Sequence, residues 1–162
     1  MKIDLDLLTK LKACKQGTVW FKSQHETEHN KVIKKLLEEG KFTWANWLIV
    51  RLLDKKQRVK YAIFAAELVL HIFQSKYPKN QRPRQAIQAA KNYLINDTFV
   101  SAADAATAAA AYAATAAAAY AATAAAAYAA AADATATAAA AAEKTKIIDF
   151  GLNLLKEESL IG

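Results

Sequence analysis

Cysteine, proline and glycine are scarce in this chain, and each shortage excludes a class of protein. The 162 residues include one cysteine, Cys14, two prolines and four glycines. A single cysteine excludes an internal disulfide framework and a zinc cluster built from cysteines. Few glycines and prolines argue against turn-rich sandwiches and barrels. The composition therefore predicts an all-α fold.

Long hydrophobic runs and targeting signals are missing as well. Residues 1–6 lack the apolar stretch of a secretory signal. Alanine is nearly neutral for membrane insertion, and threonine, tyrosine and aspartate interrupt the alanine-rich part of the chain, so no window is strongly apolar. We expect a cytoplasmic protein that does not bind membranes.

Positive charge is concentrated in the first 100 residues. That region holds 19 lysines and arginines against 9 aspartates and glutamates, whereas the whole chain has a net charge of +7. A basic surface attracts nucleic acid, anionic membranes or an acidic protein. Because lysine outnumbers arginine and the charges are spread over several segments, a solvated surface rich in lysine is the favoured interpretation.

Apolar spacing predicts five helices before residue 100. Capping residues set several of their ends: Thr43 and the Asp54–Gln57 pair as starts, and Gly40 as a stop. The expected helices cover residues 5–23, 32–37, 43–53, 55–77 and 83–94.

Alanine dominates the next segment, since 31 of the 39 alanines fall between residues 102 and 142. An eight-residue unit repeats there, with Tyr112, Tyr120 and Tyr128 at its ends, and alanine has the highest helix propensity. Each repeat turns about 80° further around a helix of 3.6 residues per turn. The threonines therefore form no flat row of the kind that ice binding needs.

A single compact domain is predicted from these segments. Basic N-terminal helices occupy residues 1–100, the alanine-rich helical tract 101–142, and a closing amphipathic helix 143–162. We expect the long alanine-rich helix to pack against the shorter N-terminal helices in a compact helical bundle. A break is expected near residues 133–137, which hold the tract's weakest helix formers.

Two pairs of ionisable residues have the spacing of chemical sites. The segment His25-Glu-Thr-Glu-His29 matches a short zinc-binding pattern, but no third ligand follows at short spacing. A solvated polar linker is therefore the favoured interpretation. Glu67 and His71 lie four residues apart in an apolar helix, where we expect a buried structural pair, completed by Arg82 or Arg84, more than an acid–base dyad.

The cysteine and the tryptophans also have two interpretations each. Cys14 lies between two lysines that would lower its pKa, but the sequence places no base beside it, so we expect a buried apolar side chain. Trp20, Trp44 and Trp47, near Arg51, could stack on nucleic-acid bases. Their helical spacing beside leucine and isoleucine favours core positions instead. No catalytic set emerges from these residues.

Two segments, Trp44-Ala-Asn-Trp47 and Arg82-Pro-Arg84, are distinctive, and residues 13–21, 60–67 and 147–152 accompany them around the alanine tract. Taken in this order, the segments resemble a family of bacterial and phage immunity proteins. The resemblance covers nearly the whole chain. It implies an all-helical protein without catalytic residues that binds and neutralises a toxin, or that binds a host protein in the case of a phage.

The sequence thus predicts a non-enzymatic protein-binding module of immunity or inhibitor type, with no cofactor and no metal. A basic nucleic-acid-binding accessory protein is the alternative, and the steep salt dependence of phosphate contacts would distinguish it. Monomer and homodimer both remain open. The predicted partner contacts are the cations near two helix starts, Lys55, Lys56, Arg58, Arg82 and Arg84.

Overall fold

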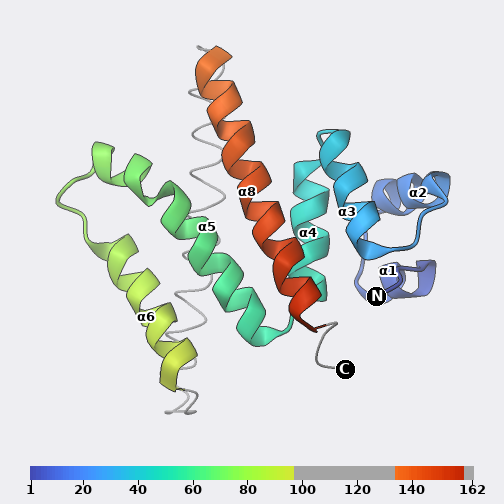
Figure 1. The fold of residues 1–162 in the computed structure, drawn as a ribbon, viewed down its shortest axis with the longest axis horizontal. Coiled ribbons are helices and arrows are strands. Elements are labelled where there is room, and N and C mark those ends of the chain that lie inside the picture. Colours follow the sequence, from blue (N-terminus) through green and yellow to red (C-terminus); the bar gives the residue numbers. More distant parts are fainter. Residues whose placement is uncertain (97–133, 159–162) are drawn as a thin grey trace. The chain divides into compact units, whose positions relative to one another are not determined.

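The computed structural model describes residues 1–96 and 134–158, and the regular elements in these ranges are seven α-helices (Figure 1). The predicted all-α class is confirmed. The chain divides into unit 1, residues 1–53 and 151–162, and unit 2, residues 54–150. Our expectations for residues 101–133, including the three repeat tyrosines, lie outside the described residues.

Unit 1 begins with two short helices, α1 (Leu5–Lys10) and α2 (Lys15–Gln24). The single helix predicted over residues 5–23 is therefore wrong. Lys12 has a left-handed backbone, with a φ of 59°, and a new helix then starts after Cys14. The Cys14 Sγ accepts a hydrogen bond from the Gly17 N–H at 3.4 Å and so caps α2. The apolar periodicity continues across residues 11–14, but the cap at Cys14 starts a separate helix there.

The next two helices of unit 1 are α3 (His29–Glu38) and α4 (Phe42–Leu52), which pack against each other. Gly40 ends α3 with a φ of 69°, as predicted, and the Lys41 N–H donates to the Leu36 carbonyl at 2.7 Å. This is a Schellman turn. It brings the Lys41 carbonyl to the start of α4, so Thr43 lies inside the helix and is not its N-cap, contrary to our expectation.

The last helix, α8 (Ala134–Glu158), runs from residue 134 through most of the predicted closing segment. The break expected near residues 133–137 stays a prediction, because residue 133 lies outside the described residues. Its final turns belong to unit 1. They contribute Leu152, Leu154 and Leu155, each at most 4% exposed. The other large buried apolar side chains of unit 1 are Ile3, Leu8, Phe21, Val32, Ile33, Leu36, Leu48, Ile49 and Leu53.

Unit 2 is built on a helical hairpin of α5 (Lys55–Lys76) and α6 (Arg82–Asn96), which lie side by side in Figure 1. Small and branched side chains join the two helices. Ile63 and Ala66 of α5 meet Ile87 and Ala90 of α6 in a buried cluster. In the same unit, Phe64 stacks on Phe150 of α8 with ring centroids 4.2 Å apart.

The start of α5 carries the predicted capping box. The Asp54 carboxylate accepts from the Gln57 N–H at 2.8 Å, and the Gln57 side-chain oxygen accepts from the Asp54 N–H at 3.0 Å. These reciprocal bonds satisfy backbone donors that a helix start otherwise leaves without partners. In the described ranges, none of the helices combines the length and the apolar character that a membrane span requires.

Replacing Asp54 tests this cap. We expect Asp54→Ala to lower the free energy of unfolding by about 0.5–2 kcal/mol, because the Gln57 N–H loses its acceptor. Asp54→Asn keeps an oxygen at the same place and should lose much less. Urea unfolding followed by far-UV circular dichroism measures both. Equal losses in the two variants would contradict a capping role.

Candidate functional site

The His25-Glu-Thr-Glu-His29 segment is a connection between helices and not one helical face. His25 is exposed and has a left-handed backbone after α2, with a φ of 53°. His29 begins α3 and is buried, with its Nδ1 2.8 Å from the Met1 carbonyl oxygen. The same-face geometry that the zinc pattern requires is therefore absent. Across residues 1–96 and 134–158, no group of three potential metal ligands is found.

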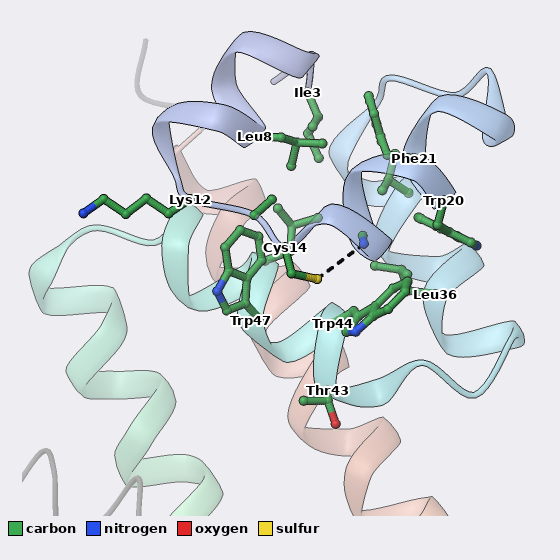
Figure 2. A pocket seen from close by; sticks show the side chains of 14 residues that line it. Ile3, Leu8, Lys12, Cys14, Trp20, Phe21, Leu36, Thr43, Trp44 and Trp47 are labelled. Carbon is green, nitrogen blue, oxygen red and sulfur yellow. Dashed lines mark hydrogen bonds between the residues drawn. The ribbon is translucent and has the colours of Figure 1, made fainter.

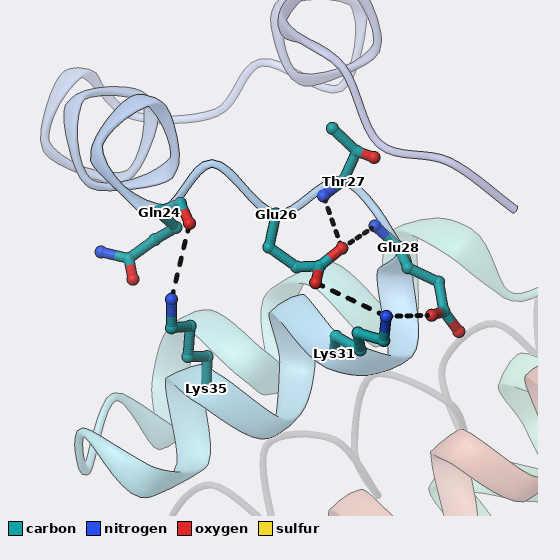
Figure 3. A network of polar contacts seen from close by, with 6 residues as sticks. All are labelled: Gln24, Glu26, Thr27, Glu28, Lys31 and Lys35. Atoms are coloured by element: carbon teal, nitrogen blue, oxygen red, sulfur yellow. Dashed lines mark hydrogen bonds and ion pairs between the residues drawn. The ribbon is translucent and has the colours of Figure 1, made fainter.

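The acidic residues of this segment organise the start of α3 (Figure 3). Glu26 accepts hydrogen bonds from the backbone N–H groups of Glu28 and Thr27, both at 2.9 Å. These bonds, with the charge of Lys31, hold the pKa of Glu26 below its usual value. Lys31 also pairs with Glu28 at 3.4 Å. The interpretation as a polar linker agrees with this arrangement, except that His29 is buried.

The expected buried pair of Glu67 and His71 is wrong. Both side chains are exposed, and Glu67 forms an ion pair with Lys91 of α6. The buried face of α5 is formed by other positions, such as Ile63 and Ala66, so residues 67 and 71 lie beside that face and not on it. An exposed pair of this kind contributes at most about 1 kcal/mol, which fits neither an acid–base dyad nor a structural core pair.

The prediction for Cys14 is also wrong. The thiol is exposed because the chain leaves α1 after Lys10 and places Cys14 at the start of α2. The side chain contributes to the rim of a surface pocket, described next. The helix break that put it there was not visible in the apolar spacing.

All three tryptophans of the chain line one open pocket of about 210 Å³ in unit 1, called here the tryptophan pocket (Figure 2). They are half-buried, so their predicted core position is only partly right. Trp20 meets Trp44 edge to face, with centroids 6.3 Å apart. The pocket lining comprises Ile3, Leu8, Lys12, Ala13, Cys14, Gly17, Trp20, Phe21, Val32, Leu36, Thr43, Trp44, Trp47 and Leu48.

Glu39 fixes the orientation of Trp20. The indole Nε1–H donates to the Glu39 carboxylate at 2.7 Å, and the Lys41 ammonium pairs with the same oxygen. Lys41 first, and Trp20 second, hold the pKa of Glu39 below its ordinary value of 4.5. A lowered pKa in the folded state means that these contacts stabilise the fold above the ordinary pKa. Their effect is lost as the pH falls through the lowered pKa.

We therefore expect acid to change the environment of Trp20 before the protein unfolds. Below about pH 4.5, the ordinary pKa of the group, tryptophan emission should shift as Glu39 is protonated. Glu39→Gln should remove this step, whereas Glu38→Gln, at the exposed neighbour, should keep it. An unchanged titration in the Glu39 variant would show that another group causes the shift.

The predicted partner-contact cations form two groups in unit 2. Lys55, Lys56 and Arg58 lie at the start of α5, where the Lys55 ammonium lies 5.7 Å from the centre of the Tyr93 ring and Arg58 donates to the Asp54 carbonyl at 3.2 Å. Arg82 and Arg84 lie at the start of α6, at the other end of the hairpin. The 22 residues of α5, at a rise of 1.5 Å each, separate the two ends of the hairpin by about 33 Å.

The end of the hairpin where α5 is joined to α6, residues 71–84, forms an exposed surface that we call the hairpin tip. Ile72 and Tyr77 are 40% and 48% exposed. The rings of Tyr77 and Phe73 contact each other, with centroids 5.1 Å apart. The Asn80 N–H donates to the Tyr77 carbonyl at 3.1 Å. Arg84 donates to the side-chain oxygen of Gln74 at 3.2 Å and so links the two helices. The tip thus combines exposed apolar side chains and arginines around a hydrogen-bonded turn.

Charge at the hairpin tip has one sign. The sequence from residue 68 to residue 96 contains five lysines and arginines and no aspartate or glutamate. Sequence reasoning selected Arg82 and Arg84 but missed Ile72 and Tyr77. The absence of acidic residues from 68 to 96 was the sequence signal that could have predicted the whole surface.

A family model described as Imm-5 like putative immunity protein matches residues 49–160. The chain belongs to this family. The recognised resemblance is thereby confirmed, and the match includes the hairpin tip and both groups of cations. Neither a curated protein nor a solved structure matches the chain. The lining of the tryptophan pocket, by contrast, comes entirely from residues 3–48, which precede the matched region.

Proposed function

We propose that this protein is a non-enzymatic immunity-type or inhibitor-type module that binds an acidic partner protein through the hairpin tip. One observation carries the proposal. Exposed Ile72 of α5 and Tyr77 of the connection lie in the same hairpin tip as Arg82 and Arg84 of α6, in a stretch without acidic residues and inside the region that the family model matches.

The composition of the tip favours protein binding. Tyrosine and arginine are enriched among the residues that dominate binding energy at protein interfaces. The turn is held by hydrogen bonds from Asn80 to Tyr77 and from the Arg82 N–H to the Asn80 side-chain oxygen, the latter at 3.1 Å. An ordered turn loses little conformational entropy on binding. The cations at the start of α5 remain predicted partner contacts, but we expect them to contribute less to binding than the tip. They are Lys55, Lys56 and Arg58.

A nucleic-acid-binding accessory role is the second candidate, because the same acid-free stretch would also attract phosphates. The two roles differ in salt dependence. Phosphate contacts weaken steeply between about 50 and 200 mM salt. A protein interface with an apolar centre weakens much less.

The test is capture of partners from the native host with the tagged full chain and two charge-matched variants. Arg82→Glu with Arg84→Glu changes the tip, and Lys22→Glu with Lys34→Glu makes the same charge change on exposed residues of unit 1. We expect one acidic protein to be retained by the wild type and the control and lost by the tip variant. When that protein is produced in the host, its effect on growth should be suppressed by the chain.

Three results would contradict the proposal. Retention of the partner by the tip variant would remove the tip from the interface. Loss of all captured material after nuclease treatment, or between 50 and 200 mM salt, would favour nucleic acid. A captured protein whose activity the chain leaves unchanged would contradict an immunity or inhibitor role.

A further inference from the structure

We propose that the tryptophan pocket binds a small organic anion through its apolar group. The inference does not depend on the proposed function, because the lining residues lie in unit 1 and the hairpin tip lies in unit 2. Three observations support it: the size of the pocket, its apolar floor and the positive charge around its rim.

Size and lining define the apolar part of the ligand. Buried Leu8, Phe21 and Leu36 contribute to the floor, and the half-buried tryptophans form the walls (Figure 2). The volume is about 210 Å³, whereas a cavity of about 150 Å³ holds one benzene molecule. The pocket therefore suits an apolar group of about eight to ten non-hydrogen atoms, such as an eight-carbon chain.

The charges around the rim indicate whether the ligand is an anion or a cation. Aromatic faces attract cations, but cations of this chain already lie over two of the walls. Arg51 lies 5.5 Å from the centre of the Trp47 ring, and the Lys41 ammonium lies 5.9 Å from that of Trp44. Residues 7–24, which supply half of the lining, contain four lysines and no acidic residue. A cationic ligand would meet repulsion here, and an anionic one attraction.

Two polar groups of the pocket lining are already engaged. The Trp20 Nε1–H donates to Glu39, which Lys41 also neutralises, and the Gly17 N–H donates to Cys14 Sγ. Lys12 is the one charged residue of the lining, so the ligand's charged group belongs at the rim beside it. Lys12 lines the pocket with its alkyl stem, and its ammonium extends away from the tryptophans toward the outside (Figure 2).

The chain contains its own reporters for the test, since all three tryptophans and the only cysteine line this pocket. Octanoate and octylammonium serve as probes, because they share a chain length, differ in charge and do not absorb where tryptophan is excited. Tryptophan emission should change saturably with octanoate, with a dissociation constant of about 0.1–1 mM for ten non-hydrogen atoms. Octylammonium should bind at least about fivefold more weakly. Octanoate should also slow the alkylation of Cys14 by N-ethylmaleimide.

Two pairs of variants locate the site. A Cβ at Gly17 would lie 3.5 Å from Cys14 Sγ, an ordinary contact, so Gly17→Ala should bind octanoate whereas the longer side chain of Gly17→Leu should fill the space. Lys12→Glu should abolish the preference for octanoate over octylammonium, and Lys22→Glu, with the same charge change on an exposed residue outside the lining, should keep it. If Gly17→Leu fails to fold, wild-type protein alkylated at Cys14 with a bulky maleimide should show the same loss of binding.

Several outcomes would overturn the proposal. Equal affinity for both probes would remove the selection for anions. Octanoate binding that survives both pocket filling and Cys14 alkylation would place the ligand elsewhere. Protection of Cys14 by a partner protein, with no effect of octanoate, would make the pocket a docking site for a protein side chain.

Discussion

A chain truncated after Ser101 is expected to lose cooperative unfolding. The deletion removes α8, whose residues Ile147, Ile148, Leu152, Leu154 and Leu155 are each at most 4% exposed. Unit 1 loses the last three of these side chains and unit 2 the first two. Each truncation of a buried leucine or isoleucine costs about 2–5 kcal/mol, and the total stability of a domain is only about 5–15 kcal/mol.

Thermal unfolding followed by near-UV and far-UV circular dichroism measures this loss. The truncated chain should retain helical signal without a sharp transition. A peptide of residues 143–158 added in trans should restore part of the near-UV signal if the missing contacts are the cause. A sharp transition with native-like near-UV signal in the truncated chain alone would show that α8 is an appendage.

The second large effect is expected from one isoleucine of α8. Ile148 is 0% exposed, so Ile148→Ala should lower the free energy of unfolding by about 2–5 kcal/mol. The loss combines the transfer of the removed atoms and the cavity that they leave. Ile95→Ala is the matched control, because the same atoms are removed from a side chain that is 77% exposed.

Urea unfolding of both variants provides the comparison. The control should stay within about 0.5 kcal/mol of the wild type, as surface substitutions usually do. If the two substitutions lower the free energy of unfolding by similar amounts, whether large or small, α8 does not pack as described.

The candidate site was only partly predictable from sequence. Arg82 and Arg84 were found because arginines beside proline mark a helix start. Tyr77 and Ile72 were not, because nothing local distinguishes an exposed apolar residue near the end of a helix from a buried one. The tryptophan pocket was missed for a related reason: its lining comes from α1 to α4, and the break at Lys12 that opens α2 depends on a cap by Cys14 Sγ.

The sequence by itself determined the helical class, the capping box at Asp54 and the turn at Gly40. These features depend on local physics, since helix propensity, capping and left-handed glycine involve residues only a few positions apart. Tertiary structure decided which side of each helix is buried. Glu67 and His71 are four residues apart in an apolar helix, yet both are exposed because α6 packs on the neighbouring face through Ile87 and Ala90. Burial depends on the position of a second helix, which the spacing along the first does not contain.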